Sequence, residues 1–227
     1  KLINGEWRPG DKLPAESDLA RTVCVSLGTL RRATQELVDE GIFERRAGVG
    51  TLVSTFQTRR YWNRFQPLVR TDGTPRFDER RQIVFETVPA PEFVAPVLTL
   101  ALGAPVLRMV RPMMKGKEVA AELAIIDENY LVPALFPQLT EAKVLLRFHA
   151  DDSLYKFYDR EFGVVVIRQK CEAGVEAIDG ATAQTLSLSF VPAAPWPTLR
   201  RTSYTYGMTP VEYRITRAAP GEHQALA

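Results

Sequence analysis

Two arginine pairs near the start of the chain have the chemistry to read a nucleic acid. Arg31 and Arg32 fall on a predicted helix, and Arg45 and Arg46 precede a Gly-Val-Gly tip. A guanidinium group is a planar fork that can donate two hydrogen bonds to O6 and N7 of one guanine. The alternative is that these arginines only solvate a surface, balanced by acids that lie late in the helix or beyond it: Glu36, Asp39, Glu40 and Glu44. Because those acids lie away from the start of the helix, we favour DNA binding.

Small residues beside these arginines could hold the DNA backbone. Ser26 stands where the N-cap of the helix is expected. A helix N-terminus binds phosphate through its N–H groups and its dipole. Gly48 and Gly50 would let the main chain approach the sugar-phosphate edge.

An arginine and a glutamate further along could bind a small anion. With residues 105–114 and 117–126 as paired strands and Lys115-Gly116 as a two-residue turn, Arg111 lies opposite Ala120, and Glu122 faces the same side. Arg111 would bind an anionic group bidentately, and Glu122 would accept from a hydroxyl or an amine. The alternative is a structural salt bridge. A small carboxylated or amino-acid-like metabolite suits this pair.

Ser153 begins a predicted helix over residues 153–162. Its hydroxyl either caps that helix or, with the helix N-terminus, contacts the same ligand. Tyr155, in the first turn, is assigned to the core.

The sequence predicts neither a metal site nor a cofactor. His149 lies beside Asp151 and Asp152, but acids adjacent in a loop are usually solvated, and His223 has no partner at ligand spacing.

The elements that must position the arginines form a compact pattern. Pro14 suits the first turn of one helix, and a second helix follows Ser26, with Leu30, Ala33, Thr34 and Leu37 spaced to bury one face. Gly41 has the position of a C′ residue. Residues 42–53 then form two short β segments around the glycine tip. A helix, a tight turn, a second helix and a hairpin describe a winged helix-turn-helix, whose second helix enters the major groove.

The rest of the chain has a different pattern of residue types. Residues 55–76 are a basic stretch with a turn, and from residue 77 onward Val, Ile, Phe and Tyr alternate with polar residues as in strands. We therefore expect an α+β fold in three parts. These are a DNA-binding domain over residues 1–54, a linker over 55–76, and a domain with a mostly antiparallel sheet over 77–227.

Composition excludes several classes. The chain has 227 residues, 45% hydrophobic and 25% charged, which is ordinary for a globular protein, and its net charge of +2 does not indicate a polyanionic partner. Cys24 and Cys171 fit no metal or redox spacing. The apolar stretch over residues 94–107 is too short for a membrane span. We expect a cytoplasmic protein without a membrane segment, and, since Lys1 is not a methionine, further residues before it.

The first 54 residues resemble the GntR family of bacterial transcription regulators. The resemblance lies in EWRPGDKLPAE at residues 6–16, LA at 19–20, VS at 25–26, TLRRA at 29–33, and GIF through GVGT at 41–51. Ser17 and Leu27 stand where the family has arginines. DNA recognition would therefore rely on Arg31, Arg32 and the wing, which is the hairpin over residues 42–53. The resemblance adds Thr29 to the DNA-binding set.

Residues 77–217 are similar to the ligand-sensing UTRA domain of the HutC branch, which resembles the chorismate-lyase fold. The matching fragments are GAPV at residues 103–106 leading to Arg111, then Glu122, SLY at 153–155, EFGV at 161–164 and PVEY at 210–213. The resemblance implies an effector site that contains Arg111, Glu122, Ser153 and Glu212.

The resemblance implies a ligand-responsive transcription regulator, usually a repressor, that binds an inverted-repeat operator in double-stranded DNA as a homodimer. Two alternatives are open. One is an enzyme on the lyase fold, although we find no nucleophile–base pair, phosphate loop or metal set. The other is an architectural DNA-binding protein whose second domain serves only for dimerisation.

Overall fold

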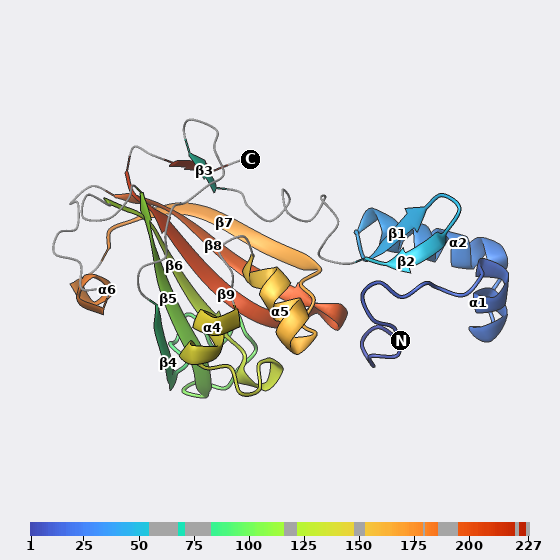
Figure 1. Ribbon diagram of the computed structural model, residues 1–227, viewed down its shortest axis with the longest axis horizontal. Coiled ribbons are helices and arrows are strands. Elements are labelled where there is room, and N and C mark those ends of the chain that lie inside the picture. The colour runs from blue at the N-terminus through green and yellow to red at the C-terminus, as the bar shows by residue number, and fades with distance from the viewer. Residues whose placement is uncertain are drawn as a thin grey trace. The chain divides into compact units, whose positions relative to one another are not determined.

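The chain divides into an N-terminal unit, residues 1–62, with helices and a small hairpin, and a C-terminal unit, residues 63–227, built on a six-stranded sheet (Figure 1). The computed structural model describes residues 1–54, 68–70, 83–115, 122–147, 153–178, 180–185, 195–220 and 223–225. Side chains of residues 68–70, 114, 115, 122–124, 181, 182, 185 and 223–225 lie outside this description. No helix of the described residues is long and apolar enough to cross a membrane.

The two helices of the N-terminal unit are joined by a tight turn. Helix α1 (Glu16–Thr22) leads to Cys24, whose φ of 55° turns the chain toward α2 (Leu27–Asp39). Ser26 is the N-cap of α2, since its hydroxyl accepts a hydrogen bond from the Thr29 N–H at 3.1 Å. Leu30 and Thr34 of this helix are buried as predicted, but Ala33 is exposed.

Gly41 ends α2 as predicted. With φ at 75° it donates its N–H to the Val38 carbonyl, and Ile42 donates to the Leu37 carbonyl, which is the Schellman arrangement. The chain then enters β1 (Phe43–Arg46), which pairs antiparallel with β2 (Gly50–Val53). The core of this unit is apolar and includes Leu13, Leu19, Leu30, Ile42, Phe43 and Val53.

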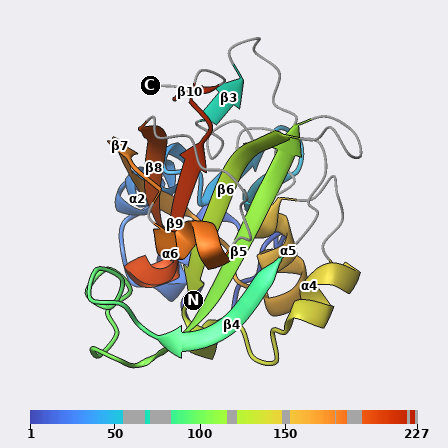
Figure 2. The ribbon, with the colours of Figure 1, turned by 90° about the vertical axis from the view of Figure 1, so that its left-hand side faces the viewer.

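The sheet of the C-terminal unit has the strand order β4-β5-β6-β9-β8-β7, and all of its neighbours are antiparallel (Figure 2). Its strands are β4 (Val84–Pro89), β5 (Pro105–Lys115), β6 (Glu122–Leu131), β7 (Arg168–Glu176), β8 (Trp196–Thr205) and β9 (Thr209–Ala218). A separate pair joins β3 (Leu68–Arg70) to β10 (His223–Ala225). The short helices are α4 (Glu141–Arg147), α6 (Gly180–Thr185) and two 3-10 turns, η2 (Pro133–Leu135) and η3 (Tyr206–Met208).

The two faces of the sheet are covered differently. Helix α5 (Leu154–Phe162) lies over one face, which we call the α5 face (Figure 1). Its buried tyrosines donate hydrogen bonds to Glu212 on strand β9. The other face packs against the chain that follows β4, where Val94 and Leu98 meet Tyr130 and Ile215.

Ser153 caps α5. Its hydroxyl accepts a hydrogen bond from the Lys156 N–H at 3.1 Å, and Gly163, with φ at 65°, follows the last residue of the helix. The predicted helix over residues 153–162 is therefore confirmed, and so is the assignment of Tyr155 to the core.

The predicted register of the β5–β6 hairpin is wrong. Arg111 lies opposite Asp127 and not Ala120. The reason is the length of the connection. Strand β5 continues to Lys115 and β6 begins at Glu122, so residues 115 and 116 are not a two-residue turn, and the register also shifts next to Met113. Glu122 pairs through its backbone with Lys115, and its side chain lies outside the described residues.

The cap of α2 gives a test of the fold. Gly41→Ala should lower the free energy of unfolding by roughly 1–2 kcal/mol, because an L-residue with a Cβ is strained in the left-handed region. Urea unfolding followed by circular dichroism measures this loss. Gly28→Ala, in the first turn of the same helix, is the control and should be neutral or stabilising, since a Cβ there meets only the Ser26 hydroxyl at 3.9 Å. Equal losses in both variants would contradict the assignment.

Candidate functional site

One acid joins helix α2 to the β1–β2 hairpin in the N-terminal unit. Glu16, at the start of α1, accepts from Arg31 Nε on α2 at 2.8 Å and lies 3.4 Å from Arg45 Nη2 on β1. Both arginine side chains stay largely exposed, at 62% and 44%. Glu16 therefore holds two of the predicted DNA-binding groups on one surface without burying them.

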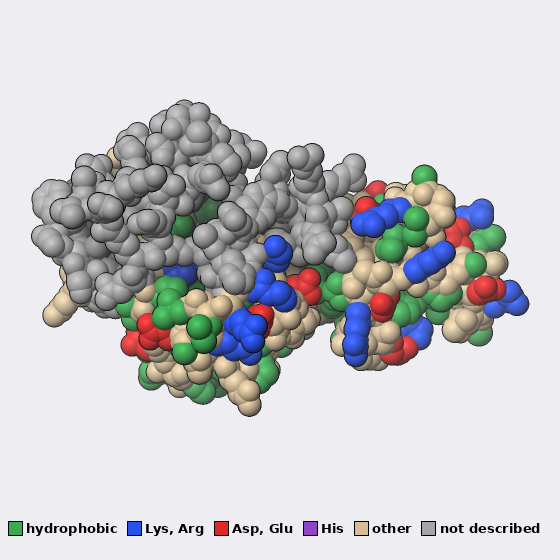
Figure 3. Space-filling model, viewed as in Figure 1, with side chains coloured by type: hydrophobic (Ala, Val, Ile, Leu, Met, Phe, Trp, Pro, Cys, Tyr) green, Lys and Arg blue, Asp and Glu red, His purple; other side chains and the backbone are tan. Residues whose placement is uncertain are grey.

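The neighbouring polar residues complete this surface. Arg45 also donates to the Gln35 amide oxygen at 2.8 Å, and Arg46 pairs with Glu44 at 3.1 Å. Arg32 is exposed on α2. Basic and acidic side chains alternate over the visible face of this unit (Figure 3). The contact of Glu16 with two arginines on other elements has no local signal in the sequence.

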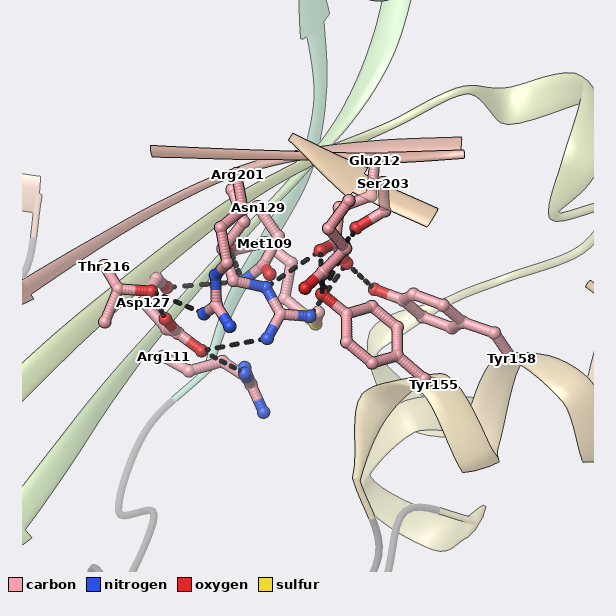
Figure 4. A network of polar contacts seen from close by, with 12 residues as sticks. Met109, Arg111, Asp127, Asn129, Tyr155, Tyr158, Arg201, Ser203, Glu212 and Thr216 are labelled. Atoms are coloured by element: carbon pink, nitrogen blue, oxygen red, sulfur yellow. Dashed lines mark hydrogen bonds and ion pairs between the residues drawn. The ribbon is translucent and has the colours of Figure 1, made fainter. Parts of the chain in front are cut away.

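The α5 face carries a group of ionised side chains that we call the buried charge cluster: Arg111, Asp127, Arg201, Glu212 and Arg214 (Figure 4). Each is at most 6% exposed. They come from strands β5, β6, β8 and β9, at positions where neighbouring strands bring their side chains to one face.

Asp127 is the first centre of the cluster. Its carboxylate accepts from Arg111 Nη2 and from the Thr216 hydroxyl, both at 2.5 Å, and lies 3.7 Å from Arg214 Nη1. Arg201 donates to the Thr216 hydroxyl at 2.9 Å.

Glu212 is the second centre and is fully buried. It accepts from the Tyr158 hydroxyl at 2.5 Å and the Tyr155 hydroxyl at 3.2 Å, both from α5, and pairs with Arg214 Nε at 2.8 Å. The Arg214 guanidinium lies 4.8 Å from the centre of the Tyr155 ring. Ser203 contacts the same tyrosine hydroxyl at 3.2 Å. Helix α5 is thus tied to the sheet through Glu212.

The electrostatics favour the ionised form of Asp127. Burial alone would raise the pKa of Asp127, but the guanidinium groups of Arg214, Arg111 and Arg201 hold it at about 2. Burial lowers the pKa of Arg111 and raises that of Tyr158 well above its ordinary value. The tyrosine hydroxyls therefore stay protonated and can donate to Glu212.

The structure brings some of the predicted effector residues together. Arg111 and Glu212 both belong to the buried charge cluster, at opposite ends of it. Ser153 caps α5, and Tyr155 of that helix contacts Glu212. The side chain of Glu122 lies outside the described residues.

Sequence reasoning missed Asp127, Arg201 and Arg214. The sequence did contain a signal for Arg214, because polar residues occupy every second position of one strand, at Glu212, Arg214 and Thr216. A period of two among polar residues in a strand that also carries Val211, Tyr213 and Ile215 indicates a second, polar buried face.

No group of three His, Cys, Asp or Glu side chains that could hold a metal ion occurs in the described part of the chain. The guanidinium and hydroxyl donors of the buried charge cluster make it the candidate effector site of the C-terminal unit.

Residues 1–53 match the family described as bacterial regulatory proteins, gntR family, and residues 79–223 match the UTRA domain. The chain belongs to the GntR family, in its HutC branch. Members of this family bind DNA operators, and UTRA domains bind small-molecule effectors. The protein is a ligand-responsive transcription regulator.

Relatives agree with this assignment, and a solved structure has the same fold as the C-terminal unit. The chain is 28% identical to the mannosyl-D-glycerate transport/metabolism system repressor MngR of Escherichia coli (strain K12), over 76% of this chain and 68% of that protein. It is 29% identical to the transcriptional regulator PhnF of the same organism, over 94% of this chain and 85% of that protein. The ligand-binding domain of a GntR-family regulator from Bordetella bronchiseptica, 24% identical, has the same fold, with a TM-score of 0.55 over 72% of this chain and 96% of that one.

The depressed pKa of Asp127 predicts a loss of stability in acid. Because the folded-state pKa is about 2 and the ordinary value is 3.8, the carboxylate stabilises the folded protein above about pH 4, and this stabilisation is lost as the pH falls toward 2. The contribution of Asp127 to the free energy of unfolding amounts to about 2 kcal/mol. Asp127→Asn should be less stable at neutral pH and should lack this acid-dependent loss in urea unfolding measured as a function of pH.

A second measurement keeps this prediction testable if Asp127→Asn does not fold. A carboxyl-carbon NMR titration of the wild type should place Asp127 near pH 2, and a midpoint near 3.8 would contradict the account. Asp159→Asn is the control, because burial raises the pKa of Asp159. A group with a raised carboxyl pKa makes folding more favourable in acid, so its removal should not reduce the acid-dependent loss.

Proposed function

We propose that this regulator is a repressor that binds an inverted-repeat operator as a homodimer and releases it when a small carboxylic acid binds at the buried charge cluster. In this proposal residues 1–54 bind DNA, residues 55–76 are a linker, and residues 77–227 bind the effector and dimerise. The protein acts in the cytoplasm, without cofactor or metal, and is not an enzyme.

The observation that carries the proposal is the gathering of three guanidinium groups beneath one helix. Arg111, Arg201 and Arg214 are each at least nine-tenths buried on the α5 face, where the described acids are Asp127 and Glu212. Guanidinium groups in a water-poor site bind a carboxylate more strongly than they would at the surface. A carboxylate that reaches Arg111 would form two parallel hydrogen bonds and compete with Asp127.

The remaining groups would orient the rest of the ligand. Glu212 and Glu122 would accept from a hydroxyl or an amine, and the N-terminus of α5, with Ser153, would lie at the same ligand. A small acid that also carries a hydroxyl or an amine fits this set. The name of MngR refers to mannosyl-D-glycerate, a hydroxylated carboxylate, and this supports the same ligand class here.

The effector would act on operator affinity through helix α5. Tyr155 and Tyr158 bind Glu212, so a ligand that displaces one internal ion pair changes the contacts that hold α5. The factor by which operator affinity falls equals the ratio of two effector affinities, one for the free protein and one for the operator-bound protein. On DNA, Arg31 would exchange Glu16 for a guanine, while Ser26, Thr29, Arg32, Arg45, Arg46, Gly48 and Gly50 contribute to the rest of the contact.

Arg31→Ala should abolish specific operator binding. Loss of one bidentate contact costs about 1–3 kcal/mol, and a dimer loses two, so affinity should fall by at least about thirtyfold. Fluorescence anisotropy with a duplex selected from a random library measures this. Arg21→Ala is the matched control, since Arg21 is another largely exposed arginine of the same unit and pairs with Asp18 on α1. An unchanged affinity in Arg31→Ala would contradict the recognition-helix assignment.

Thermal-shift scans against a panel of hydroxylated and amino carboxylic acids test the effector site. A stabilising acid should raise the midpoint of the wild type and leave Arg111→Ala unchanged, because bound ligand stabilises only the state that binds it. Arg108→Ala is the control. Arg108 is on the same strand but faces the other side, where it pairs with Glu86 and Glu128, and it should retain the shift.

Two results would contradict the site. One is a shift retained in Arg111→Ala. The other is that no acid of the panel stabilises the wild type and that Arg111→Ala only lowers the stability of the protein. This second result would favour an architectural protein without an effector.

A further inference from the structure

The first turn of helix α2 exposes one long side chain, and that side chain is apolar. Leu27, the first residue of the helix, is 37% exposed. Gly28 has no side chain, and Leu30 is buried. The hydroxyls of Ser26 and Thr29 lie 2.8 Å apart, and the Ser26 hydroxyl also accepts from the Thr29 N–H. Because these hydroxyls are engaged in the helix cap, Leu27 is the residue of this turn that extends furthest toward a partner.

Leu27 shares a face of α2 with Arg31. Residues four apart on a helix lie one above the other, so Leu27, Arg31 and Gln35 form an exposed stripe along α2. Arg31 stays 62% exposed while its Nε donates to Glu16. Gln35 accepts from Arg45 of the hairpin. A surface that presents Arg31 to DNA therefore presents Leu27 as well, one helical turn nearer to the N-terminus.

The side chain of Leu27 can recognise one feature of a base pair in the major groove. It has neither a donor nor an acceptor, so it would displace water from the polar edge of a base without replacing the hydrogen bonds. The 5-methyl group of thymine is the apolar group that this groove displays. In a helix-turn-helix, the N-terminal residues of the second helix contact the base edges. Such a leucine therefore favours thymine over the other bases.

The backbone at the start of α2 can come close to the bases. A Cβ at Gly28 would meet only the Ser26 hydroxyl, at 3.9 Å, so the space beside this residue is open. A side chain at position 28 would keep the helix further from the groove. A close approach is what a leucine needs, since it is shorter than an arginine.

We propose that Leu27 contacts the 5-methyl group of one thymine in each half-site of the operator and determines specificity at that base pair. The proposal rests on the proposed function, because it requires α2 to lie in the major groove with Arg31 on a guanine. Four residues of helix advance by about 6 Å. This distance is close to two base-pair steps of about 3.4 Å. The thymine should therefore lie within about two base pairs of the guanine that Arg31 contacts.

Replacement of thymine by deoxyuridine tests the contact, since uracil differs from thymine only in lacking the 5-methyl group. A duplex is first selected from a random library with the full chain, and each half-site should contain the guanine and the thymine. Deoxyuridine at this thymine in both half-sites should lower the affinity of the wild type about tenfold in fluorescence anisotropy, because each half-site loses one buried methyl group. Deoxyuridine at a thymine outside the half-sites is the control and should leave the affinity unchanged.

Variants of Leu27 assign the methyl contact to this residue. Leu27→Gln keeps a similar length and helix propensity but ends in an amide, so it should bind the thymine and deoxyuridine duplexes with equal affinity. Leu27→Met stays apolar and should retain most of the difference between the duplexes. Each ratio compares two duplexes with the same protein, so a variant of lower stability still gives a valid ratio.

The outcomes separate this inference from the proposed function. Three results would overturn the thymine contact and leave an operator-binding regulator: a selected half-site without thymine near the guanine, a wild-type affinity that does not depend on the methyl group, or a difference that persists in Leu27→Gln. A library that yields no preferred duplex would overturn both the contact and the proposed operator.

Discussion

The burial of three guanidinium groups on one sheet face is the constraint on which the C-terminal unit depends. A charge removed from water costs many kcal/mol unless an opposite charge and further hydrogen bonds replace the solvent. Asp127 and Glu212 supply those charges from the directly paired strands β6 and β9, and Thr216 adds a hydroxyl. A slip of one residue would move an acid to the opposite face, so the cluster fixes the register of the sheet. It also fixes α5, because Tyr155 and Tyr158 must reach Glu212.

The other face of the same sheet uses charges differently. Arg108 joins Glu86 and Glu128, and Arg217 joins Glu128 and Glu176, so acids and bases alternate along a line that crosses the strands. Burial alone would raise the pKa of Glu128, but these two arginines lower it. Along this line each acid lies between bases, and among the described residues no helix contacts it through hydroxyl groups. The α5 face gathers its guanidinium groups around two acids beside a helix, and because of this difference we propose the α5 face as the effector site.

Local signals made the N-terminal unit predictable. Ser26 caps a helix through the N–H three residues on, Gly41 ends it through bonds to Leu37 and Val38, and each motif lies within one short segment of sequence. The contact of Glu16 with Arg31 and Arg45 joins three elements and has no local signature. In the C-terminal unit, Arg111 and Glu212 could be named as site residues. Their partners could not, because the partner of Arg111 depends on the length of the β5–β6 connection, and hydrophobic alternation does not determine that length.

The central claim is that a small acid at the buried charge cluster lowers operator affinity. The most direct test is a linkage cycle that measures the operator Kd with and without saturating effector, and the effector Kd with and without operator. The account predicts that both constants rise by the same factor, because coupling between two binding sites is reciprocal. It also predicts that Arg111→Ala abolishes this factor while its operator affinity without effector stays that of the wild type. An operator Kd that is the same with and without bound acid would contradict the account.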